Sequence, residues 1–218
     1  MLWRSRSPRV RSPLAPASFI DPCLPTKAVK PPSGDAWAHE IKHDGYRLQI
    51  HVGPSRVRLL TMTGADWTER YPRIVAAAKR LKRAAVIDAE VVVAGTDGIA
   101  DFEALQSRIQ DSEAVAFCFD LLAHDGRDLR VMPLIDRKSL LSELVRSRRH
   151  RNLDSLHYVE HLIGDGALIF KHVCALGLEG IVSKRLDSKY RSGRSKAWLK
   201  TRNPNAPAAR RIEGGTFA

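Results

Sequence analysis

The stretch Lys42-His43-Asp44-Gly45-Tyr46-Arg47 constrains this chain most, because it sets a lysine and an Asp-Gly pair between two strand-like segments. Residues 37–41 can form a strand, and residues 46–52 alternate between apolar and polar side chains. An Asp-Gly pair between two such segments is typical of a hairpin turn. We therefore expect a β-hairpin with Lys42 at the end of its first strand, where functional side chains often lie.

The rest of the chain alternates short apolar segments with helical patterns. Strands are expected at 37–52, 56–61, 86–93, 115–122, 179–184 and 197–202. Helices are expected to follow Asp66 or Thr68 as N-cap, to begin at Phe102, to follow Pro133, and to run from about Ala167 to Leu176 before Gly177. The order lacks a regular β-α-β period. We therefore predict an α+β fold of mostly antiparallel sheets flanked by helices.

Two carboxylates are expected on one wall of a pocket. In the strand at 86–93, Asp88 and Glu90 are two residues apart, so both side chains point to the same face. The opposite face carries Ile87, Val91 and Val93, which read as core.

Composition favours a polyanionic partner. The 218 residues carry 36 Lys and Arg against 24 Asp and Glu, a formal charge of +12, and cations bind nucleic acid by releasing counterions from its phosphates. Residues 1–18 contain four arginines and no acid, and we interpret them as a disordered basic arm. The three cysteines are widely spaced, which favours a reducing cytosol, and no apolar run is long enough for a membrane span.

Five elements occur in a characteristic order. They are Lys42 to Arg47, Ile87-Asp88-Ala89-Glu90, Phe117 to Leu122, Glu179 to Lys184, and Trp198 to Arg202. In this order they resemble the nucleotidyltransferase motifs of ATP-dependent DNA ligases, most closely the bacterial ligase D type. The resemblance covers residues 19–204, which would form the adenylation domain, with 205–218 as a flexible tail. It implies a monomer of the bacterial cytosol or nucleoid that acts on nicked or broken double-stranded DNA in repair or recombination.

The resemblance also implies the roles of individual residues. Lys42 would be the residue adenylated by ATP, with Glu40 and Arg47 in the nucleotide site. Glu90 and Glu179 correspond to carboxylates associated with Mg²⁺ or Mn²⁺, for which hard oxygen ligands are suited. Glu90 would also contact the nucleotide.

The later motifs supply an aromatic residue and three cations. Phe119 resembles the family aromatic that stacks on adenine, whereas Trp198 reads as a core residue. Lys184 and Lys200 match lysines that contact the α-phosphate, and Arg202 stands where a lysine is commoner.

The expected chemistry consists of three nucleotidyl transfers. ATP adenylates Lys42, AMP passes to a DNA 5′-phosphate, and a 3′-hydroxyl then displaces AMP to seal the break. A lysine attacks only as the free amine, so neighbouring cations such as Arg47 and Lys184 are expected to favour the uncharged form.

Two departures from the family pattern leave other functions open. Met62 stands in Thr61-Met62-Thr63-Gly64 where related ligases usually have an arginine, a loss of about 1.5–3 kcal/mol if a charged hydrogen bond is missing. The residues after Arg202 are too few for the oligonucleotide-binding (OB) barrel that ligases carry there, so no C-terminal OB-fold is expected. The chain would then be a minimal ligase, a protein that relies on a separate OB-fold or end-binding repair protein, or a truncated product with partial or no activity. The alternatives are a catalytically weakened or silent DNA-end binder, and an RNA ligase or capping-type nucleotidyltransferase.

Overall fold

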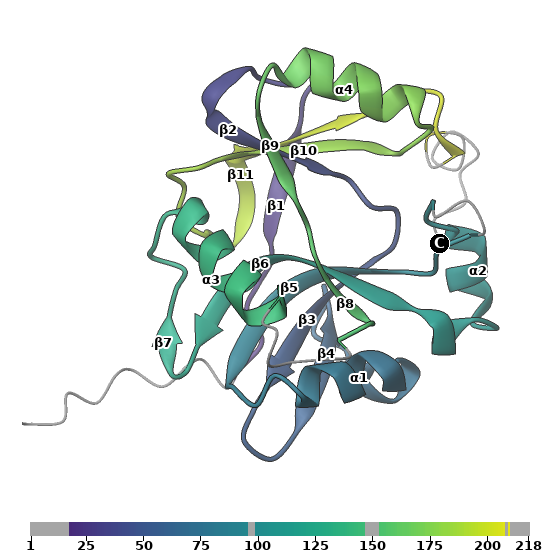
Figure 1. Ribbon diagram of the computed structural model, residues 1–218, viewed down its shortest axis with the longest axis vertical. Coiled ribbons are helices and arrows are strands. Elements are labelled where there is room, and N and C mark those ends of the chain that lie inside the picture. The colour runs from purple at the N-terminus through teal and green to yellow at the C-terminus, as the bar shows by residue number, and fades with distance from the viewer. Residues whose placement is uncertain (1–17, 96–98, 147–152, 208, 210–218) are drawn as a thin grey trace, which may run out of the picture.

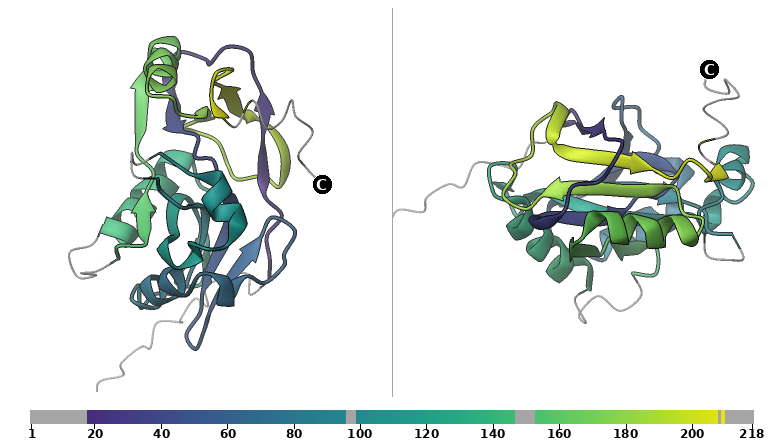
Figure 2. Two further views of the ribbon diagram at one scale, coloured as in Figure 1. Left: turned by 90° about the vertical axis from the view of Figure 1, so that its right-hand side faces the viewer. Right: turned by 90° about the horizontal axis from the view of Figure 1, so that it is seen from above.

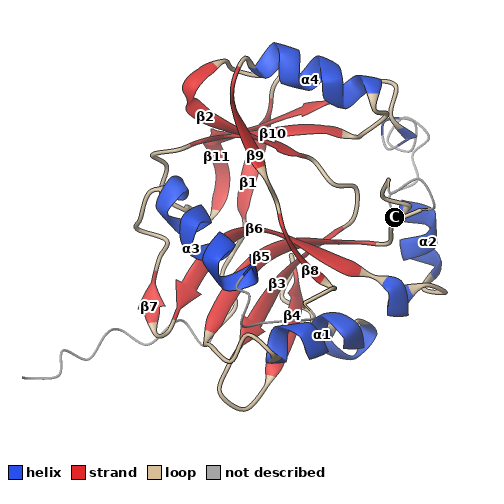
Figure 3. Ribbon diagram, viewed as in Figure 1, coloured by secondary structure: helices blue, strands red, loops and turns tan. Residues whose placement is uncertain are grey.

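The computed structural model describes residues 18–95, 99–146, 153–207 and 209. Two β-sheets lie one above the other along the longest axis of the molecule (Figure 1). Helix α4 lies at one end beyond the first sheet and α1 lies near the other end beyond the second, as Figures 2 and 3 also show. The predicted arm 1–18 lies outside the described residues except for Ser18, and so does most of the predicted tail 205–218.

Sheet A contains the two strands that carry Lys184 and Lys200. Its strand order is β1-β11-β10-β2-β9, and all pairs are antiparallel except β1 with β11. The bounds are β1 Cys23–Lys27, β2 Gly34–Ile41, β9 His161–Gly164, β10 Gly180–Arg185 and β11 Gly193–Arg202. Helix α4, Gly166–Ala175, packs on β2 and β10. It ends before Gly177, whose φ of 72° marks the predicted helix stop.

Sheet B has the order β4-β3-β5-β6-β7, and β8 pairs in parallel with β6. The bounds are β3 Tyr46–Val52, β4 Val57–Thr61, β5 Ala85–Val92, β6 Val115–His124, β7 Arg127–Asp128 and β8 Leu156–Tyr158. Its helices are α1 Pro72–Lys79, α2 Phe102–Ser107 and α3 Leu134–Arg146, with 3₁₀ turns at Thr68–Arg70 and Asp111–Glu113. The main core lies between this sheet and α1 and α3. The predicted α+β fold with mostly antiparallel sheets is confirmed.

The predicted hairpin at Asp44-Gly45 is wrong. Strand β2 pairs with β10 and β9 in sheet A, whereas β3 pairs with β4 and β5 in sheet B. The connection therefore crosses from one sheet to the other. A Cβ on Gly45 would lie 2.1 Å from the carbonyl oxygen of Val91, so glycine is needed here for a close approach of two backbones. An Asp-Gly pair suits either situation, and only the sheet pairing distinguishes them.

The predicted cap of the first helix is also wrong. Helix α1 begins at Pro72, and its N-cap, Tyr71, makes no side-chain capping bond. Asp66 instead accepts a 3.0 Å bond from the amide of Thr68, and Thr68 Oγ1 accepts one of 3.0 Å from the amide of Leu59. Both side chains thus fix the turn before the helix, and a proline in the first turn supplies the favourable start.

The two faces of β5 divide as predicted. Ile87, Val91 and Val93 belong to the main core, whereas Val86 packs in a second cluster with Trp198 and Tyr190 of sheet A's side. Asp88 and Glu90 share this second face, which lies toward the space between the sheets. None of the helices in the described part of the chain combines the length and apolar character needed to cross a bilayer.

Candidate active site

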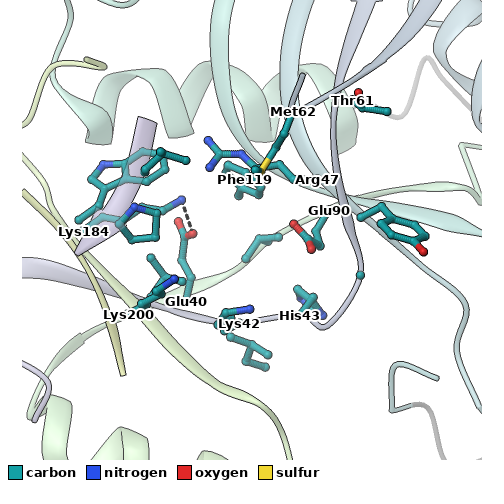
Figure 4. A pocket seen from close by; sticks show the side chains of 18 of the residues that line it. Glu40, Lys42, His43, Arg47, Thr61, Met62, Glu90, Phe119, Lys184 and Lys200 are labelled. Atoms are coloured by element: carbon teal, nitrogen blue, oxygen red, sulfur yellow. Dashed lines mark ion pairs between the residues drawn. The ribbon is translucent and has the colours of Figure 1, made fainter. Parts of the chain in front are cut away.

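A cavity of about 580 Å³ lies between the two sheets. Strands of both sheets and the 42–45 crossing contribute side chains to it (Figure 4). The predicted site residues that line it are Glu40, Lys42, Arg47, Glu90, Phe119, Lys184, Lys200 and Arg202. Glu179, the remaining predicted residue, lies beside the cavity in contact with Lys42. The fold therefore brings together residues that are up to 162 positions apart in sequence, from Glu40 to Arg202.

Lys42 faces a carboxylate. Its Nζ lies 2.6 Å from Oε2 of Glu179, and its amide nitrogen donates a 2.9 Å bond to the carbonyl of Gly180. Gly180 has a φ of 143°, and a Cβ there would lie 2.2 Å from the carbonyl oxygen of Thr201. Glycine at this position therefore lets the backbone of Glu179 come close to β11 and to Lys42.

Glu40 lies at the buried floor of the cavity between two lysines. Oε1 accepts a 2.6 Å bond from Nζ of Lys138, and Oε2 lies 2.5 Å from Nζ of Lys184. Burial by itself would raise the pKa of Glu40, but Lys138 and Lys184 outweigh it and hold the pKa below its ordinary value. Burial lowers the pKa of Lys184, and Glu40 offsets only part of that effect.

Glu90 has a different electrostatic environment. Burial raises its pKa to about 7, and the nearby charges of Glu179 and Asp88 add to that rise. Lys42 and Arg47 act in the opposite direction without cancelling it. The half-buried carboxyl of Glu90 thus has too little positive charge around it.

The donor set near Lys42 fits a hard divalent cation. Glu90 and Glu179 offer carboxylate oxygens and influence one another electrostatically, and Glu90 lacks sufficient compensating charge. Within the described ranges, no group of three or more His, Cys, Asp or Glu residues forms a ready cation cage. Two carboxylates leave coordination positions for water and phosphate, which is the manner in which Mg²⁺ usually binds at phosphate sites.

The guanidinium of Arg47 links the two sheets. Its Nε and Nη2 donate to the two oxygens of Asp88 at 2.9 and 2.7 Å, and Nη1 donates to the carbonyl of Cys23 at 2.8 Å. The hydroxyl of Tyr190 donates to Asp88 at 2.8 Å. Strands β3 and β5 of sheet B are thereby joined to β1 of sheet A, and this network fixes the width of the cavity.

The aromatic side of the cavity consists of Phe119 and Trp198. Their rings are T-shaped at 6.2 Å, and Nζ of Lys184 lies 4.3 Å from the centre of the Phe119 ring. Trp198 is 2% exposed, so its predicted place in a core is confirmed, although it also lines the cavity. His43 stacks on Phe117 at 3.9 Å, and burial lowers its pKa to about 4.

Met62 lines the cavity from sheet B's side and is 48% exposed. It follows β4 directly, and its side chain points toward Phe119 and Arg47 in Figure 4. A thioether at this position offers no cation to the cavity, and the loss of binding energy expected from it stays a prediction.

The sequence analysis missed Arg194, which lines the cavity from β11, and Lys138. Lys138 lies in α3 and is fully buried behind Glu40. A signal was present, because Leu134, Lys138, Leu141 and Val145 recur at helical spacing on one buried stripe. A lysine within an apolar stripe requires a buried acid as partner. The sequence alone does not identify that partner, since Glu40 is 98 positions away.

Known proteins match this chain over most of its length. A sequence model of the "ATP dependent DNA ligase domain" matches residues 22–202. The multifunctional non-homologous end joining protein LigD of Pseudomonas aeruginosa is 39% identical over 186 residues, 84% of this chain and 22% of that protein. The SPbeta prophage-derived DNA ligase-like protein LigB of Bacillus subtilis is 30% identical over 190 residues, 85% of this chain and 68% of that protein. This chain therefore spans only about a fifth of the LigD relative's length.

Solved structures have the same architecture. The ligase domain of Mycobacterium tuberculosis LigD has a TM-score of 0.75 at 36% identity, covering 83% of this chain and 58% of that one. Mycobacterial DNA ligase D in complex with ATP and MES gives the same TM-score of 0.75 and covers 83% and 59%. The bacteriophage T7 ATP-dependent DNA ligase, at 16% identity and a TM-score of 0.63, covers 84% and 68% and shows a shared fold only.

Proposed function

Because this chain belongs to the ATP-dependent DNA ligase domain family, we propose that Nζ of Lys42 attacks the α-phosphorus of ATP. The resemblance read from the five sequence motifs is thereby confirmed at the level of the family. In the proposed step a bond forms between Nζ and phosphorus while the bond to the pyrophosphate oxygen breaks, and pyrophosphate leaves. The observation that carries the proposal is the Lys42–Glu179 contact of 2.6 Å beside a cavity of nucleotide size.

Glu179 is suited to take the proton that Lys42 must lose. An ammonium has no lone pair, so attack requires transfer of that proton to a nearby base. The carboxylate of Glu179 already contacts Nζ, and Arg202 lies 3.6 Å from its other oxygen. The same carboxylate that holds the amine in place can thus accept its proton.

Lys184 and Lys200 would stabilise the charge that develops on the phosphate oxygens. Both side chains line the cavity on adjacent strands, β10 and β11. Burial, followed by the charges of Arg202 and Lys42, lowers the pKa of Lys200. Cations already present in a partly dehydrated cavity need little rearrangement when charge moves toward the leaving group.

The aromatic end of the cavity would hold the nucleobase. Phe119 offers a ring face for stacking, and the ionised carboxylate of Glu40 is an acceptor that suits an exocyclic amino group such as that of adenine. The ion pair with Asp88 fixes the position of Arg47, which would contact the sugar of the nucleotide from there.

Glu90 and Glu179 would hold a Mg²⁺ or Mn²⁺ ion, as their oxygen donors and the uncompensated burial of Glu90 fit one. When bound, the cation supplies positive charge that neutralises phosphate oxygens and favours the uncharged amine. The protein's own part is to position two carboxylates on either side of Lys42.

The later transfers would use DNA. We propose that the bound AMP passes to a 5′-phosphate at a nick or end and is then displaced by a 3′-hydroxyl, as part of break repair. The formal charge of +12 supports binding of a polyanion. We also propose contacts with an end-binding repair protein, a monomeric state and a cytosolic location. The free thiols of Cys23, Cys118 and Cys174 support a reducing compartment.

Labelling with nucleotide tests the central step. The protein is incubated with α-labelled ATP or GTP and Mg²⁺, and covalent label is resolved on a denaturing gel. We expect label from ATP that is lost by at least about 1,000-fold in Lys42→Ala, because no other amine occupies its position. Lys196→Ala, an exposed lysine of β11, is the matched control and should label normally.

Other outcomes would favour the alternatives. Label from GTP in place of ATP would indicate capping-type chemistry. Absence of label with retained binding to nicked DNA would indicate a silent DNA-end binder, an outcome that Met62 makes worth testing. Label that persists in Lys42→Ala would contradict the assignment of the nucleophile.

A further inference from the structure

Lys138 is a buried charge that the proposed transfer does not use directly. It is fully buried and does not line the cavity. Its Nζ donates to Oε1 of Glu40 at 2.6 Å and to the carbonyl of Val159 at 3.0 Å, and it lies 4.7 Å from the centre of the Tyr158 ring. Both hydrogen-bond acceptors belong to residues that line the cavity, so this lysine supports the floor from behind.

Lys184 approaches the same carboxylate in a different manner. Its Nζ lies 2.5 Å from Oε2 of Glu40, and within the described structure no second acceptor receives a hydrogen bond from this nitrogen. Lys184 also lines the cavity, whereas Lys138 does not. One lysine is therefore committed to Glu40, and the other retains donors that can be directed at a ligand.

The charges of Glu40, Lys138 and Lys184 explain why two lysines are present. If Glu40 had Lys184 as its sole cation, movement of Lys184 toward a phosphate would leave a buried carboxylate unpaired, which is strongly unfavourable. With Lys138 held in place, Glu40 remains paired while Lys184 moves. Three ions with a net charge of +1 also suit the arrival of a phosphate anion better than a neutral pair does.

We propose that Lys138 is a positioning residue for nucleotidyl transfer, which keeps Glu40 fixed and ionised and so leaves Lys184 free to contact the nucleotide phosphate. The inference rests on the proposed function, because the phosphate in question is that of the ATP that adenylates Lys42. Lys138 itself contacts neither substrate nor reacting atoms. It acts from α3 through Glu40 on Lys184.

The test compares adenylation rates at saturating ATP. In Lys138→Met the side chain keeps its length and loses its charge, so Lys184 becomes the sole partner of Glu40 and should remain with it. We expect labelling to slow at least tenfold while the urea unfolding midpoint stays close to that of the wild type, since a neutral pair remains. Lys79→Met, an exposed lysine at the end of α1, is the control and should label at the wild-type rate.

A double variant separates positioning from a merely structural role. In Lys138→Met with Glu40→Gln, the amide oxygen still offers the nucleobase an acceptor but no carboxylate retains Lys184, so at saturating ATP the rate should rise at least threefold above that of Lys138→Met alone. A structural role predicts the opposite, because a second substitution in the floor would slow labelling further. A double variant slower than Lys138→Met would overturn the inference.

The remaining outcomes are also decisive. Wild-type labelling together with unchanged labelling in Lys138→Met would overturn this inference and leave the proposed function intact, whereas an unlabelled wild type would overturn both. If Lys138→Met does not fold, Glu40→Gln is compared with the double variant. Equal rates would support action through Glu40, and a slower double variant would contradict it.

Discussion

Glu40 and Glu90 lie on opposite walls of one cavity and have opposite protonation behaviour. Glu40, in β2 of sheet A, has a pKa held below its ordinary value despite burial that opposes this shift, because Lys138 and Lys184 contact its two oxygens. Glu90, in β5 of sheet B, has a pKa raised by burial to about 7. Glu40 is 2% exposed and Glu90 is half-buried, so depth of burial alone would predict the opposite order of the two pKa values. The number of cations in direct contact accounts for the difference.

The difference assigns the two walls different tasks. A carboxylate paired with two cations, such as Glu40, is a fixed acceptor that stays ionised to lower pH than an ordinary glutamate. A carboxylate with a deficit of positive charge attracts a proton or a cation. Glu40 is therefore suited to a fixed place beside a ligand, and Glu90 to binding a cation.

The largest effect is expected from removing the negative charge between the two lysines. Glu40→Gln leaves two buried ammonium groups without a carboxylate, which should lower the free energy of unfolding by about 3–5 kcal/mol. Urea unfolding followed by circular dichroism measures this change. Glu113→Gln, at an exposed ion pair with Arg73, is the matched control and should change stability by less than about 1 kcal/mol. A loss as small as the control's would mean that Glu40 is not the counter-ion of both lysines.

Replacing Glu90 is expected to stabilise the folded protein, whereas replacing Glu40 destabilises it. The folded pKa of Glu90, about 7, exceeds the ordinary value of 4.5, so the folded state binds more protons than the unfolded state between these limits. Stability of the wild type therefore falls as pH rises from about 4.5 to about 7. Glu90→Gln lacks this loss and should be more stable than the wild type by about 2 kcal/mol at pH 8, with little difference at pH 4.5.

Unfolding curves of both proteins at pH 4.5, 6 and 8 give the difference directly. Its growth with pH is the informative quantity, since other groups titrate equally in both proteins. If the stability difference between the two proteins stays constant or decreases as pH rises, the pKa of Glu90 is not raised in the folded state.

The smallest effect concerns cation binding. At pH 8, Mg²⁺ or Mn²⁺ at about ten times its dissociation constant should stabilise the wild type by about 1.4 kcal/mol, because it binds only the folded state. Thermal unfolding with and without the ion measures this shift. Glu90→Gln should show little of it, and addition of Na⁺ at equal ionic strength is the control. Equal stabilisation of the two proteins would place the cation elsewhere.

Local sequence pattern predicted much of the fold. The spacing of Leu140, Leu141, Leu144 and Val145 after Pro133 predicted α3, and the alternation around Asp88 and Glu90 predicted β5 with both acids on one face. These elements depend on periodicities of 3.6 and 2 residues, which are properties of the chain itself. Short or irregular segments such as β1, β8 and β9 were missed, because a few residues do not establish a period.

The sequence predicted which residues belong to the candidate site, but it did not predict which of them contact one another. The motifs identified Lys42, Glu179 and Lys184 as residue types suited to nucleotidyl transfer. They did not indicate that Glu179 contacts Lys42, or that Lys184 shares Glu40 with Lys138. The Asp44-Gly45 pair illustrates the same limit, because a turn and a sheet-to-sheet crossing place equal demands on the local backbone.

The sequence by itself determined the family, the basic charge and the reactive side chains, because these depend on residue identity and spacing alone. The tertiary structure decided which carboxylate pairs with which lysine, and hence which acid keeps its charge. Electrostatic energies inside a protein depend on distances of a few ångströms and on exclusion of water. Both are set only when strands from the two ends of the chain enclose the same cavity.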